Sequence, residues 1–558
     1  MSTQPNGVTY VDVDKDYFAE RGLSRYAGIW SLWALGVGAV ISGHFSGWNF
    51  GLATGGWGGM LVAAAIMAGM YLCLVFCIAE MSAALPRTGA SYAFARTAMG
   101  PWGGFISGLC ENVEYVLTPA VICFFIGSYL AGIFGSDTPP WLWWIGTFAV
   151  FLGLNMLGVA LSFRITLVVT LASLAILLVF FASALPHIDI RRWALNIATD
   201  GQALPEGNGP LFPMGLNGIL ATLPYAVWLY LAIEELPLAA EESVDPVRDM
   251  PKGIVLALVT LIVTAFAVVI MNSAITGVGA HQLSTSGEPL LDGFRAIFGG
   301  MHAKLFGFVA LSGLIASFHA ILYAQGRQIF SLSRAGYFPA ALSVTHKGSK
   351  TPHIAMLAGA GLGLAIMLTL WIGLGGQQAA PLIGSVLLNM AVFGAMLSYI
   401  FRAVAFIILR WRYPKMARPY RSPFGITGAV ATIIISVVTL CYQIQDPNFI
   451  KGVAWVVVWI GVGLAYFGLI GRHRLVASPE ELFAIGLEQS AIRSTNRPDN
   501  TRAWLVVLGL GLLGLGPEVF GGGLLALLGS LIAILLFCCC FRPHSLVTVR
   551  PRWRYFTI

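Results

Sequence analysis

Long apolar runs, separated by short polar connections, recur along nearly the whole chain. Each run is long enough to cross the hydrocarbon core of a bilayer, which takes about 20 residues of helix. The pattern therefore predicts an all-α polytopic membrane protein surrounded by a lipid bilayer. The predicted spans cover residues 29–54, 58–81, 102–134, 141–160, 163–185, 216–240, 253–276, 305–333, 353–373, 380–408, 425–442 and 452–470, and a further apolar stretch covers 503–540.

Composition and charge indicate the same class of protein. Hydrophobic residues make up 57% of the chain and charged residues only 10%, whereas soluble domains carry about 25% charged residues. We interpret the formal charge of +7 as basic loops on the cytoplasmic side of a membrane, and not as a nucleic-acid-binding surface. The cysteines lie in or at the end of apolar runs, without the spacing of disulfide frameworks or metal sites. Because no catalytic motif stands out either, we expect no enzyme activity, no cofactor and no metal.

Arginine and lysine collect in alternate connections, which must share one side of the membrane. These connections follow the second, sixth, eighth and tenth predicted spans and hold Arg87, Arg96, Arg248, Lys252, Arg334, Lys347, Lys350, Arg410, Arg412, Lys415, Arg418 and Arg421. The opposite loops are poorer in basic residues, although Arg191 and Arg192 lie in one of them. The polar start of the chain has no cleavable signal pattern. We therefore predict a multi-pass protein of the cell membrane, the bacterial inner membrane, with both termini in the cytoplasm.

The sixth predicted span carries an acidic pair inside an apolar run. Glu234 and Glu235 lie within this span, and Pro224 and Pro237 flank them. An ionised carboxylate inside a bilayer is costly unless it faces a water-filled cavity, pairs with another group or has a function. Proline removes a backbone hydrogen bond and leaves carbonyl groups free. A helix interrupted beside an acidic residue indicates a transporter's binding site. The alternative is that Glu234 pairs structurally with a buried lysine or arginine.

Glycines crowd the first predicted span between Gly36 and Gly47, in the sequence GVGAVISGHFSG. Each glycine weakens a helix by about 1 kcal/mol relative to alanine, so the run predicts an unwound segment whose amides and carbonyls face a ligand. Close helix packing is the alternative explanation. A broken first span and a broken sixth span occupy corresponding positions in two five-helix halves. This correspondence predicts inverted repeats with the binding site between them.

The third predicted span contributes two more carboxylates. Glu111 and Glu114 stand one turn apart and therefore share a helix face. Two carboxylates this close disfavour double ionisation, so one of them could hold a proton. Alternatively they are solvated or bonded to Arg87 or Arg96. We expect a structural role for Glu111 and a functional role for Glu114, which lies deeper in the span.

Several stretches resemble the amino acid–polyamine–organocation superfamily of transporters. They are the glycine-rich first span, residues 78–96 (IAEMSAALPRTGASYAFAR) and residues 239–253 (AAEESVDPVRDMPKG). Four stretches resemble, more narrowly, the ethanolamine permease family: ISGHFSGWNFGLATGG (41–56), ENVEYVLTPAVI (111–122), FSLSRAGYFPAALS (330–343) and YPKMARPYRSPFG (413–425). The resemblance covers residues 25–485. It implies a twelve-helix core with a five-plus-five inverted repeat, and uptake of a small amine by alternating access.

The resemblance also implies where the substrate binds. Ser42 and Gly43 fall on the superfamily's unwound first-helix segment, and Trp228 falls on an aromatic residue that closes the pocket. Glu234 falls on the acidic position of the sixth helix, directly after its unwound turn. The candidate substrate-binding residues are Ser42, Gly43, His44, Glu114, Tyr115, Thr118, Trp228, Leu231, Ala232 and Glu234. His44 departs from the pattern of amino-acid carriers, in which that position is usually apolar.

The chemistry of these residues favours an amine over an amino acid. Ethanolamine offers an ammonium and a hydroxyl group but no carboxylate, so acidic residues and carbonyls should predominate around it. The glutamates of the third and sixth spans fit that demand. His44 is ambiguous, because neutral imidazole accepts a hydroxyl proton whereas imidazolium repels the ligand. The alternatives are a carrier of small neutral amino acids and a membrane sensor that binds the amine and signals.

The candidates for ion coupling are Glu111, Ser173 and Ser317. Ser173 falls where some proton-coupled relatives place a lysine, which puts their coupling mechanism in doubt for this chain. Ser173 and Ser317, with a carbonyl near Val40, provide few and neutral ligands for sodium, whereas the candidate glutamates are proton acceptors. We therefore expect a proton-linked or uncoupled carrier. The sequence gives no prediction of the oligomeric state.

The remaining polar and apolar stretches complete the predicted division of the chain. A polar linker precedes the apolar stretch at 503–540, which exceeds one span and suits a two-helix hairpin with basic residues on both flanks. The predicted segments are a cytoplasmic N-terminal segment (1–28), the first repeat (29–214), the second repeat (215–411), the last two core helices (412–471), a linker (472–502), the hairpin (503–540) and a cytoplasmic tail (541–558).

Overall fold

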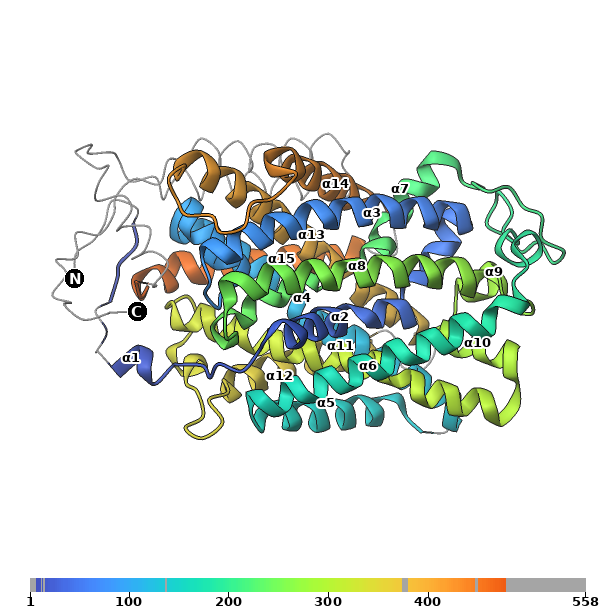
Figure 1. Cartoon of the computed structure of the whole chain (residues 1–558), viewed down its shortest axis with the longest axis horizontal. Coiled ribbons are helices and arrows are strands. Elements are labelled where there is room, and N and C mark those ends of the chain that lie inside the picture. Colours follow the sequence, from blue (N-terminus) through green and yellow to red (C-terminus); the bar gives the residue numbers. More distant parts are fainter. Residues whose placement is uncertain are drawn as a thin grey trace.

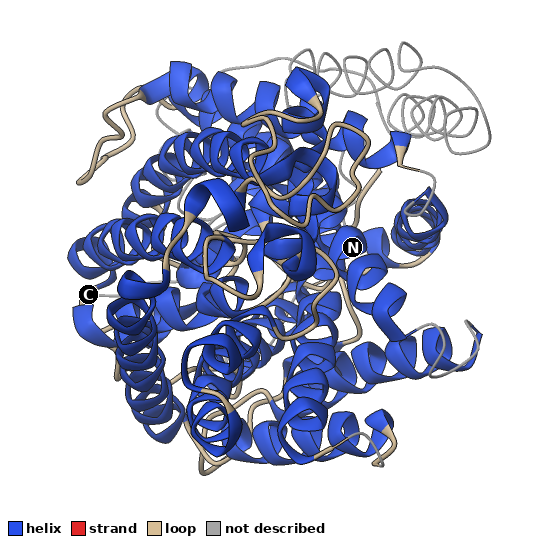
Figure 2. Cartoon of the chain, turned by 90° about the vertical axis from the view of Figure 1, so that its right-hand side faces the viewer, coloured by secondary structure: helices blue, strands red, loops and turns tan. Residues whose placement is uncertain are grey.

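The computed structural model describes residues 7–11, 13, 16–135, 138–373, 380–446 and 450–477. Within these ranges the regular structure is helical, and extended segments meet only in isolated bridges, such as the one between Tyr10 and Leu475. Most helices run along the long axis of the molecule (Figure 1), and the view along that axis shows them packed side by side as a bundle (Figure 2). The prediction of an all-α polytopic membrane protein is confirmed.

Nine helices in the described part of the chain are long and apolar enough to cross a membrane, and two shorter apolar helices, α2 and α7, accompany them. The count of twelve membrane helices and the inverted repeat stay predictions. The helices are α1 (Asp16–Ala19), α2 (Ile29–Phe45), η1 (Trp48–Phe50), α3 (Gly51–Ala84), α4 (Ala90–Phe134), α5 (Pro140–Met156), α6 (Val159–Ala184), α7 (Gly215–Val227), η4 (Ile233–Glu242), α8 (Pro246–Ser273), α9 (Gly279–Leu283), α10 (Pro289–Phe298), α11 (Gly300–Arg334), α12 (His353–Gly373), α13 (Ala380–Arg412), α14 (Gly425–Gln445) and α15 (Ile450–Leu469).

The observed helices differ from the predicted spans in a few places. α4 begins twelve residues before the predicted span at 102, as a separate arm that meets the rest of the helix at Gly100, where φ is +80°. α9 and α10 occupy the connection between α8 and α11. They have 5 and 10 residues, so a search for runs of membrane-spanning length does not detect them. The predicted hairpin at 503–540 lies outside the described residues.

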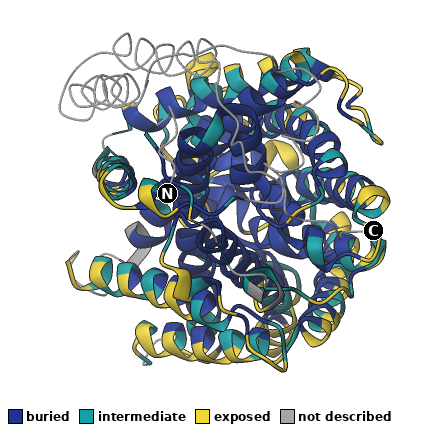
Figure 3. Cartoon of the chain, turned by 90° about the vertical axis from the view of Figure 1, so that its left-hand side faces the viewer, coloured by how far each residue is buried: buried dark blue, intermediate teal, exposed yellow. Residues whose placement is uncertain are grey.

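Burial separates inner helices from outer ones (Figure 3). Over their most apolar stretches, α13 is 83% buried and α4 is 78% buried, whereas α15 is 22% buried. The outer helices expose large apolar side chains, among them Val168, Leu171 and Leu178 of α6. Since exposed aliphatic side chains are stable against lipid but not against water, the outer face of the bundle is suited to a membrane.

One end of the bundle gathers the N-terminal segment and the basic connections, and we call it the basic end. Val244 N donates to Ala27 O at 2.9 Å, and Arg21 Nε donates to Ser343 Oγ at 2.9 Å. Arg96 Nη2 donates to Val476 O at 2.9 Å. These contacts, and the left side of Figure 1, confirm that the alternate connections lie together. That this end faces the cytoplasm stays a prediction.

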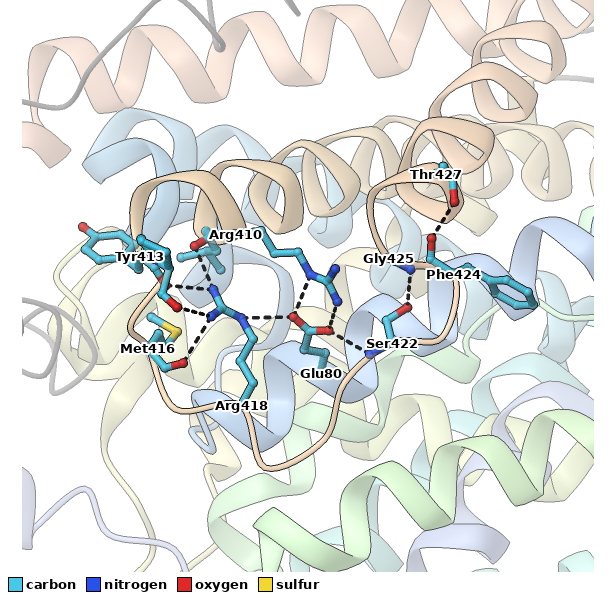
Figure 4. Close-up of polar contacts among 11 residues, drawn as sticks. Glu80, Arg410, Tyr413, Met416, Arg418, Ser422, Phe424, Gly425 and Thr427 are labelled. Atoms are coloured by element: carbon cyan, nitrogen blue, oxygen red, sulfur yellow. Dashed lines mark hydrogen bonds and ion pairs between the residues drawn. The ribbon is translucent and has the colours of Figure 1, made fainter.

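Glu80, near the end of α3, bonds to several residues in and beside the connection between α13 and α14 at the basic end (Figure 4). Its carboxylate accepts hydrogen bonds from Arg410 at 3.0 and 2.5 Å and from the backbone N of Ser422 at 2.8 Å. Arg418 Nε lies 3.1 Å from the same carboxylate. Two arginines predicted only as loop charges therefore neutralise a buried carboxylate and hold the loop against α3.

Candidate functional site

The sixth predicted span is broken where the sequence predicts. α7 ends at Val227, and η4 begins at Ile233 with 3₁₀ geometry. Ala232 joins them with φ at +81°, a left-handed conformation that residues other than glycine rarely adopt. Leu231 and Ala232 are fully buried in this turn. The turn from Trp228 to Ala232, which we call the sixth-helix break, therefore interrupts the regular helix in the interior of the bundle.

The sixth-helix break packs directly on the end of α2. A Cβ atom built on Gly43 would lie 2.2 Å from the carbonyl oxygen of Trp228, so only glycine fits there. The indole Nε1 of Trp228 donates to Ser46 O at 3.0 Å. Trp228 is 2% exposed, which excludes a lipid-facing position and places its ring between the two helices.

The first helix does not unwind at Ser42 and Gly43, so that expectation is wrong. α2 continues to Phe45, and the backbone leaves the helix at Ser46 and Gly47, where φ of Gly47 is +95°. Gly43 serves close packing, because its missing side chain admits the Trp228 carbonyl. The interruption of the first span therefore lies at the far end of the glycine-rich stretch.

Ser317 of α11 enters the backbone hydrogen bonding of α2. Its Oγ accepts from Ser42 N at 2.8 Å and donates to Gly38 O at 2.6 Å, so it joins two groups that normally bond each other in a helix. Ser173 instead donates to Thr170 O of its own helix at 2.7 Å. Of the two serines proposed for ion coupling, only Ser317 bonds to the first helix.

His44 connects α2 to two neighbouring elements. Its Nε2 lies 3.3 Å from Leu229 O in the sixth-helix break, and its Nδ1 lies 3.2 Å from Thr264 Oγ1 on α8. Because a carbonyl oxygen only accepts, Nε2 must carry the hydrogen in this contact. Both ring nitrogens therefore have protein neighbours, and His44 positions the break.

The four candidate glutamates separate into one paired residue and three unpaired ones. Glu111 forms an ion pair with Arg402 of α13, and both are buried. The alternative of a bond to Arg87 or Arg96 does not hold, because one Glu111 oxygen bonds to Arg402 and the other has no hydrogen-bond partner among the described residues. The structural role expected of Glu111 fits this ion pair. The carboxylate oxygens of Glu114, Glu234 and Glu235 are buried and receive no hydrogen bond from any described donor.

Glu114 of α4 and Glu234 of η4 lie close enough for their carboxyl groups to interact electrostatically, and both interact with Arg402 of α13. Tyr71 of α3 and Tyr399 of α13 face the same two carboxylates, and their hydroxyls are 3.1 Å apart. The interaction joins a residue of the third span to one directly after the sixth-helix break.

Comparison with known proteins identifies the family. The amino acid permease family matches residues 28–465, most of the chain. The chain belongs to the amino acid permease family. It is therefore a multi-pass secondary transporter of amino acids or related small molecules, within the amino acid–polyamine–organocation superfamily.

Relatives of this permease are named for different substrates. It is 26% identical to the methylthioribose transporter of Bacillus subtilis strain 168, over 82% of this chain and 95% of the relative. It is 25% identical to the branched-chain amino acid permease BcaP of the same strain, over 81% and 94%. An uncharacterized transporter of Rhizobium meliloti strain 1021 is 29% identical, over 74% and 85%. These relatives are permeases or transporters and not enzymes.

Two further candidates of the permease lie beside Glu114 on α4. Thr118 Oγ1 donates to Glu114 O at 2.7 Å within the helix, so its hydrogen is already used. Tyr115 is fully buried, and its hydroxyl has no hydrogen-bond partner among the described residues. The Tyr115 hydroxyl is therefore free to donate, whereas the hydroxyl of Thr118 is left only as an acceptor.

Sequence reasoning missed three residues around Glu114 and Glu234. Arg402 could have been found, since an arginine inside the predicted span 380–408 is itself a sign of pairing or function. Tyr71 and Tyr399 carry no comparable signal, because tyrosine is ordinary in membrane helices. Their importance follows only from the packing of α3 against α13.

Proposed function

We propose that this permease imports a small primary amine, ethanolamine or a close relative of it. The observation that carries the proposal is the buried pair Glu114 and Glu234, which receives no hydrogen bond from a described donor. Unpaired carboxylates in a membrane interior are costly and mark ligand sites by default. An ammonium group supplies three hydrogen-bond donors and the missing positive charge.

The local charge balance favours a cation as the substrate. Arg402 interacts with this group of glutamates, and Glu111 forms an ion pair with it. Glu114, Glu234 and Glu235 remain without a salt bridge in the described part of the chain. A substrate carboxylate would add a further negative charge, which such surroundings oppose.

Tyrosine rings add a second feature suited to an amine. The rings of Tyr71 and Tyr230 lie 5.5 Å apart, and those of Tyr71 and Tyr399 lie 5.6 Å apart. Aromatic faces attract ammonium groups, by about 0.5–2 kcal/mol. Trp228 lies at the junction of α2 and the sixth-helix break, and in this proposal its ring closes the binding site.

In this proposal the sixth-helix break and the end of α2 lie between two inverted repeats and move during alternating access. We place the permease in the cell membrane with the basic end in the cytoplasm, because lysine and arginine collect there. Small neutral amino acids are the second candidate substrates, since one relative is a branched-chain amino acid permease.

Replacing Glu234 tests the proposed site. Glu234→Gln keeps the shape of the side chain and removes the charge, so ethanolamine binding should weaken by about 1.5–3 kcal/mol, the scale of a charge-assisted hydrogen bond. The measurement is binding of radiolabelled ethanolamine to the purified protein, with uptake into proteoliposomes. Glu206→Gln, an exposed site, is the matched control.

Three outcomes would contradict the proposal. Unchanged ethanolamine affinity in Glu234→Gln would remove the carboxylate from the site. Uptake by the parent that alanine inhibits and ethanolamine does not would assign the permease to neutral amino acids. Binding of the amine without uptake into sealed vesicles would indicate a sensor instead of a carrier.

A further inference from the structure

The ion pair between Glu111 of α4 and Arg402 of α13 uses only part of its hydrogen-bonding capacity. Arg402 Nη2 donates to Glu111 Oε1. Arg402 Nε and Nη1, and the second carboxylate oxygen Glu111 Oε2, have no hydrogen-bond partner among the described residues. An arginine and a carboxylate can form two parallel hydrogen bonds. This pair forms one, and it leaves both donors and an acceptor unsatisfied.

Burial makes these unsatisfied atoms costly. The side chains of Arg402 and Glu111 are 1% and 0% exposed. In the described part of the chain, α4 and α13 are the most buried of the helices long enough to cross a membrane. Buried polar atoms in native proteins almost always have a partner, and the penalty for leaving one without a partner is larger for a charged group. We therefore expect a bound molecule to complete the hydrogen bonding between α4 and α13.

The same face of α4 carries further unsatisfied groups. Glu114 and Tyr115 follow Glu111 by three and four residues, the spacing at which helical side chains are neighbours. Both carboxylate oxygens of Glu114 and the hydroxyl of Tyr115 lack a partner among the described residues. The unsatisfied atoms of the ion pair therefore adjoin the carboxylate to which we assign the substrate ammonium.

A row of tyrosines connects the ion pair to the sixth-helix break. The guanidinium carbon of Arg402 lies 5.6 Å from the centre of the Tyr399 ring. The hydroxyls of Tyr399 and Tyr71 are 3.1 Å apart, and the rings of Tyr71 and Tyr230 lie 5.5 Å apart. Tyr230 belongs to the break. Arg402 therefore stands at the far end of the tyrosines that surround the proposed amine site.

The unsatisfied atoms require a group that both accepts and donates. The N–H groups of Arg402 only donate, and an ionised carboxylate such as Glu111 only accepts. A hydroxyl group does both. A carboxylate would place its oxygens against Glu111 Oε2 with no hydrogen between them, and a methyl group would satisfy neither side. The charges of the ion pair cancel, so a neutral partner leaves no charge uncompensated.

We infer that the unsatisfied atoms of the Glu111–Arg402 ion pair form a subsite for the hydroxyl group of the substrate. The inference rests on the proposed function, and it narrows the substrate class to small amino alcohols. Arg402 donates to the hydroxyl oxygen, and the hydroxyl hydrogen is donated to Glu111 Oε2. Arg402 thereby determines specificity, because an amine without a hydroxyl group leaves its buried donors unpaired.

Competition for radiolabelled ethanolamine on the purified full-length protein is the direct test. Propylamine has a methyl group where ethanolamine has its hydroxyl group, and glycine has a carboxylate in place of the alcohol. Unlabelled ethanolamine should compete at least about tenfold better than either.

The outcomes separate this inference from the proposed function. Equal competition by propylamine would mean that water completes the ion pair, and would overturn the inference while the amine carrier stands. Competition by glycine as strong as that of ethanolamine would assign the subsite to a carboxylate and overturn the inference. Absence of any ethanolamine binding would overturn both.

A double variant assigns the preference to the ion pair. Arg402→Met with Glu111→Gln removes both charges together, so neither is left buried alone. Its affinity for ethanolamine should fall to that of propylamine. The matched control is Arg327→Met with Glu242→Gln, at another fully buried ion pair, and it should keep the preference of the parent. A preference retained in the first variant would overturn the inference. The comparison of ligands in the parent does not depend on the folding of either variant.

Discussion

η4 carries two pairs of adjacent glutamates, and the two pairs have opposite surroundings. Glu241 accepts hydrogen bonds from Arg334 at 2.8 and 2.6 Å, and Glu242 accepts from Arg327 at 3.0 Å and from Tyr323. Glu234 and Glu235, seven residues earlier, receive no hydrogen bond from a described donor. The same dipeptide therefore occurs once with arginines and once without them.

The presence of arginine at one pair and its absence at the other indicate two different roles for buried charge in this protein. A glutamate bonded to a buried arginine stabilises the contact between their two helices. Removing either partner leaves an uncompensated buried charge. The negative charge of a buried glutamate without a donor is compensated by a group that binds and dissociates, such as a ligand or a proton. The predictions below test this division between a structural pair, Glu241–Glu242, and a ligand-facing pair, Glu234–Glu235.

The largest effect is expected from removing Arg327. Both Arg327 and Glu242 are fully buried, so Arg327→Met should destabilise the protein by about 3–5 kcal/mol. Thermal unfolding of the purified protein measures the loss. The double variant with Glu242→Gln should recover most of it. A single variant as stable as the parent would show that burial of Glu242 does not depend on Arg327. The distinction between the two glutamate pairs would then be wrong.

A smaller effect is expected at Arg334, which lies seven residues beyond Arg327 and therefore on the same face of α11. The side chains of Arg334 and Glu241 are 9% and 17% exposed, so solvent weakens their ion pair. Arg334→Gln should lower the stability by about 1 kcal/mol, and amine affinity should stay unchanged. A loss of stability as large as that of Arg327→Met would contradict the role of solvent.

The ligand-facing pair should respond with the opposite sign. Glu235 is buried and receives no hydrogen bond, so replacing its carboxyl group with an amide removes no ion pair. Glu235→Gln should leave thermal stability unchanged or raise it by up to about 1 kcal/mol. The matched variant Glu242→Gln should be destabilised. Equal losses in the two variants would show that both pairs are structural.

No effect on either pair is expected from shortening the chain. The predicted hairpin at 503–540 lies beyond residues 28–465, which the permease family matches. A chain that ends near residue 490 should insert in the membrane, unfold at the same temperature as the parent and take up ethanolamine. Normal insertion with loss of uptake would make the C-terminal extension part of the transport cycle.

The sequence predicted much of the fold and part of the site, for identifiable reasons. Apolar runs locate membrane helices because bilayer thickness sets their length. Glu234 and the prolines located the sixth-helix break for a similar reason, because each is costly in a regular membrane helix. Glu111 and its arginine were different. Their ion pair joins residues 291 positions apart, and no local pattern records which helices become neighbours.

The end of the first helix shows a second limit. A glycine-rich stretch is compatible with an unwound backbone and with close packing, and the choice depends on the partner surface. At Gly43 the partner is the carbonyl of Trp228, so the helix stays intact and the interruption moves to Gly47. Composition alone could not separate these two outcomes, because both favour glycine. An unwound backbone uses its conformational freedom, and close packing uses its missing side chain.

The shortness of α7 has a consequence for how the chain enters the membrane as it is made. Its 13 residues extend about 20 Å, less than the roughly 30 Å of the hydrocarbon core, and η4 adds four carboxyl groups. This segment alone is a poor substrate for the insertion machinery. Arg327 and Arg334 belong to α11, which is synthesised later. We therefore expect the sixth segment to settle in the bilayer only after α11 has emerged from the ribosome.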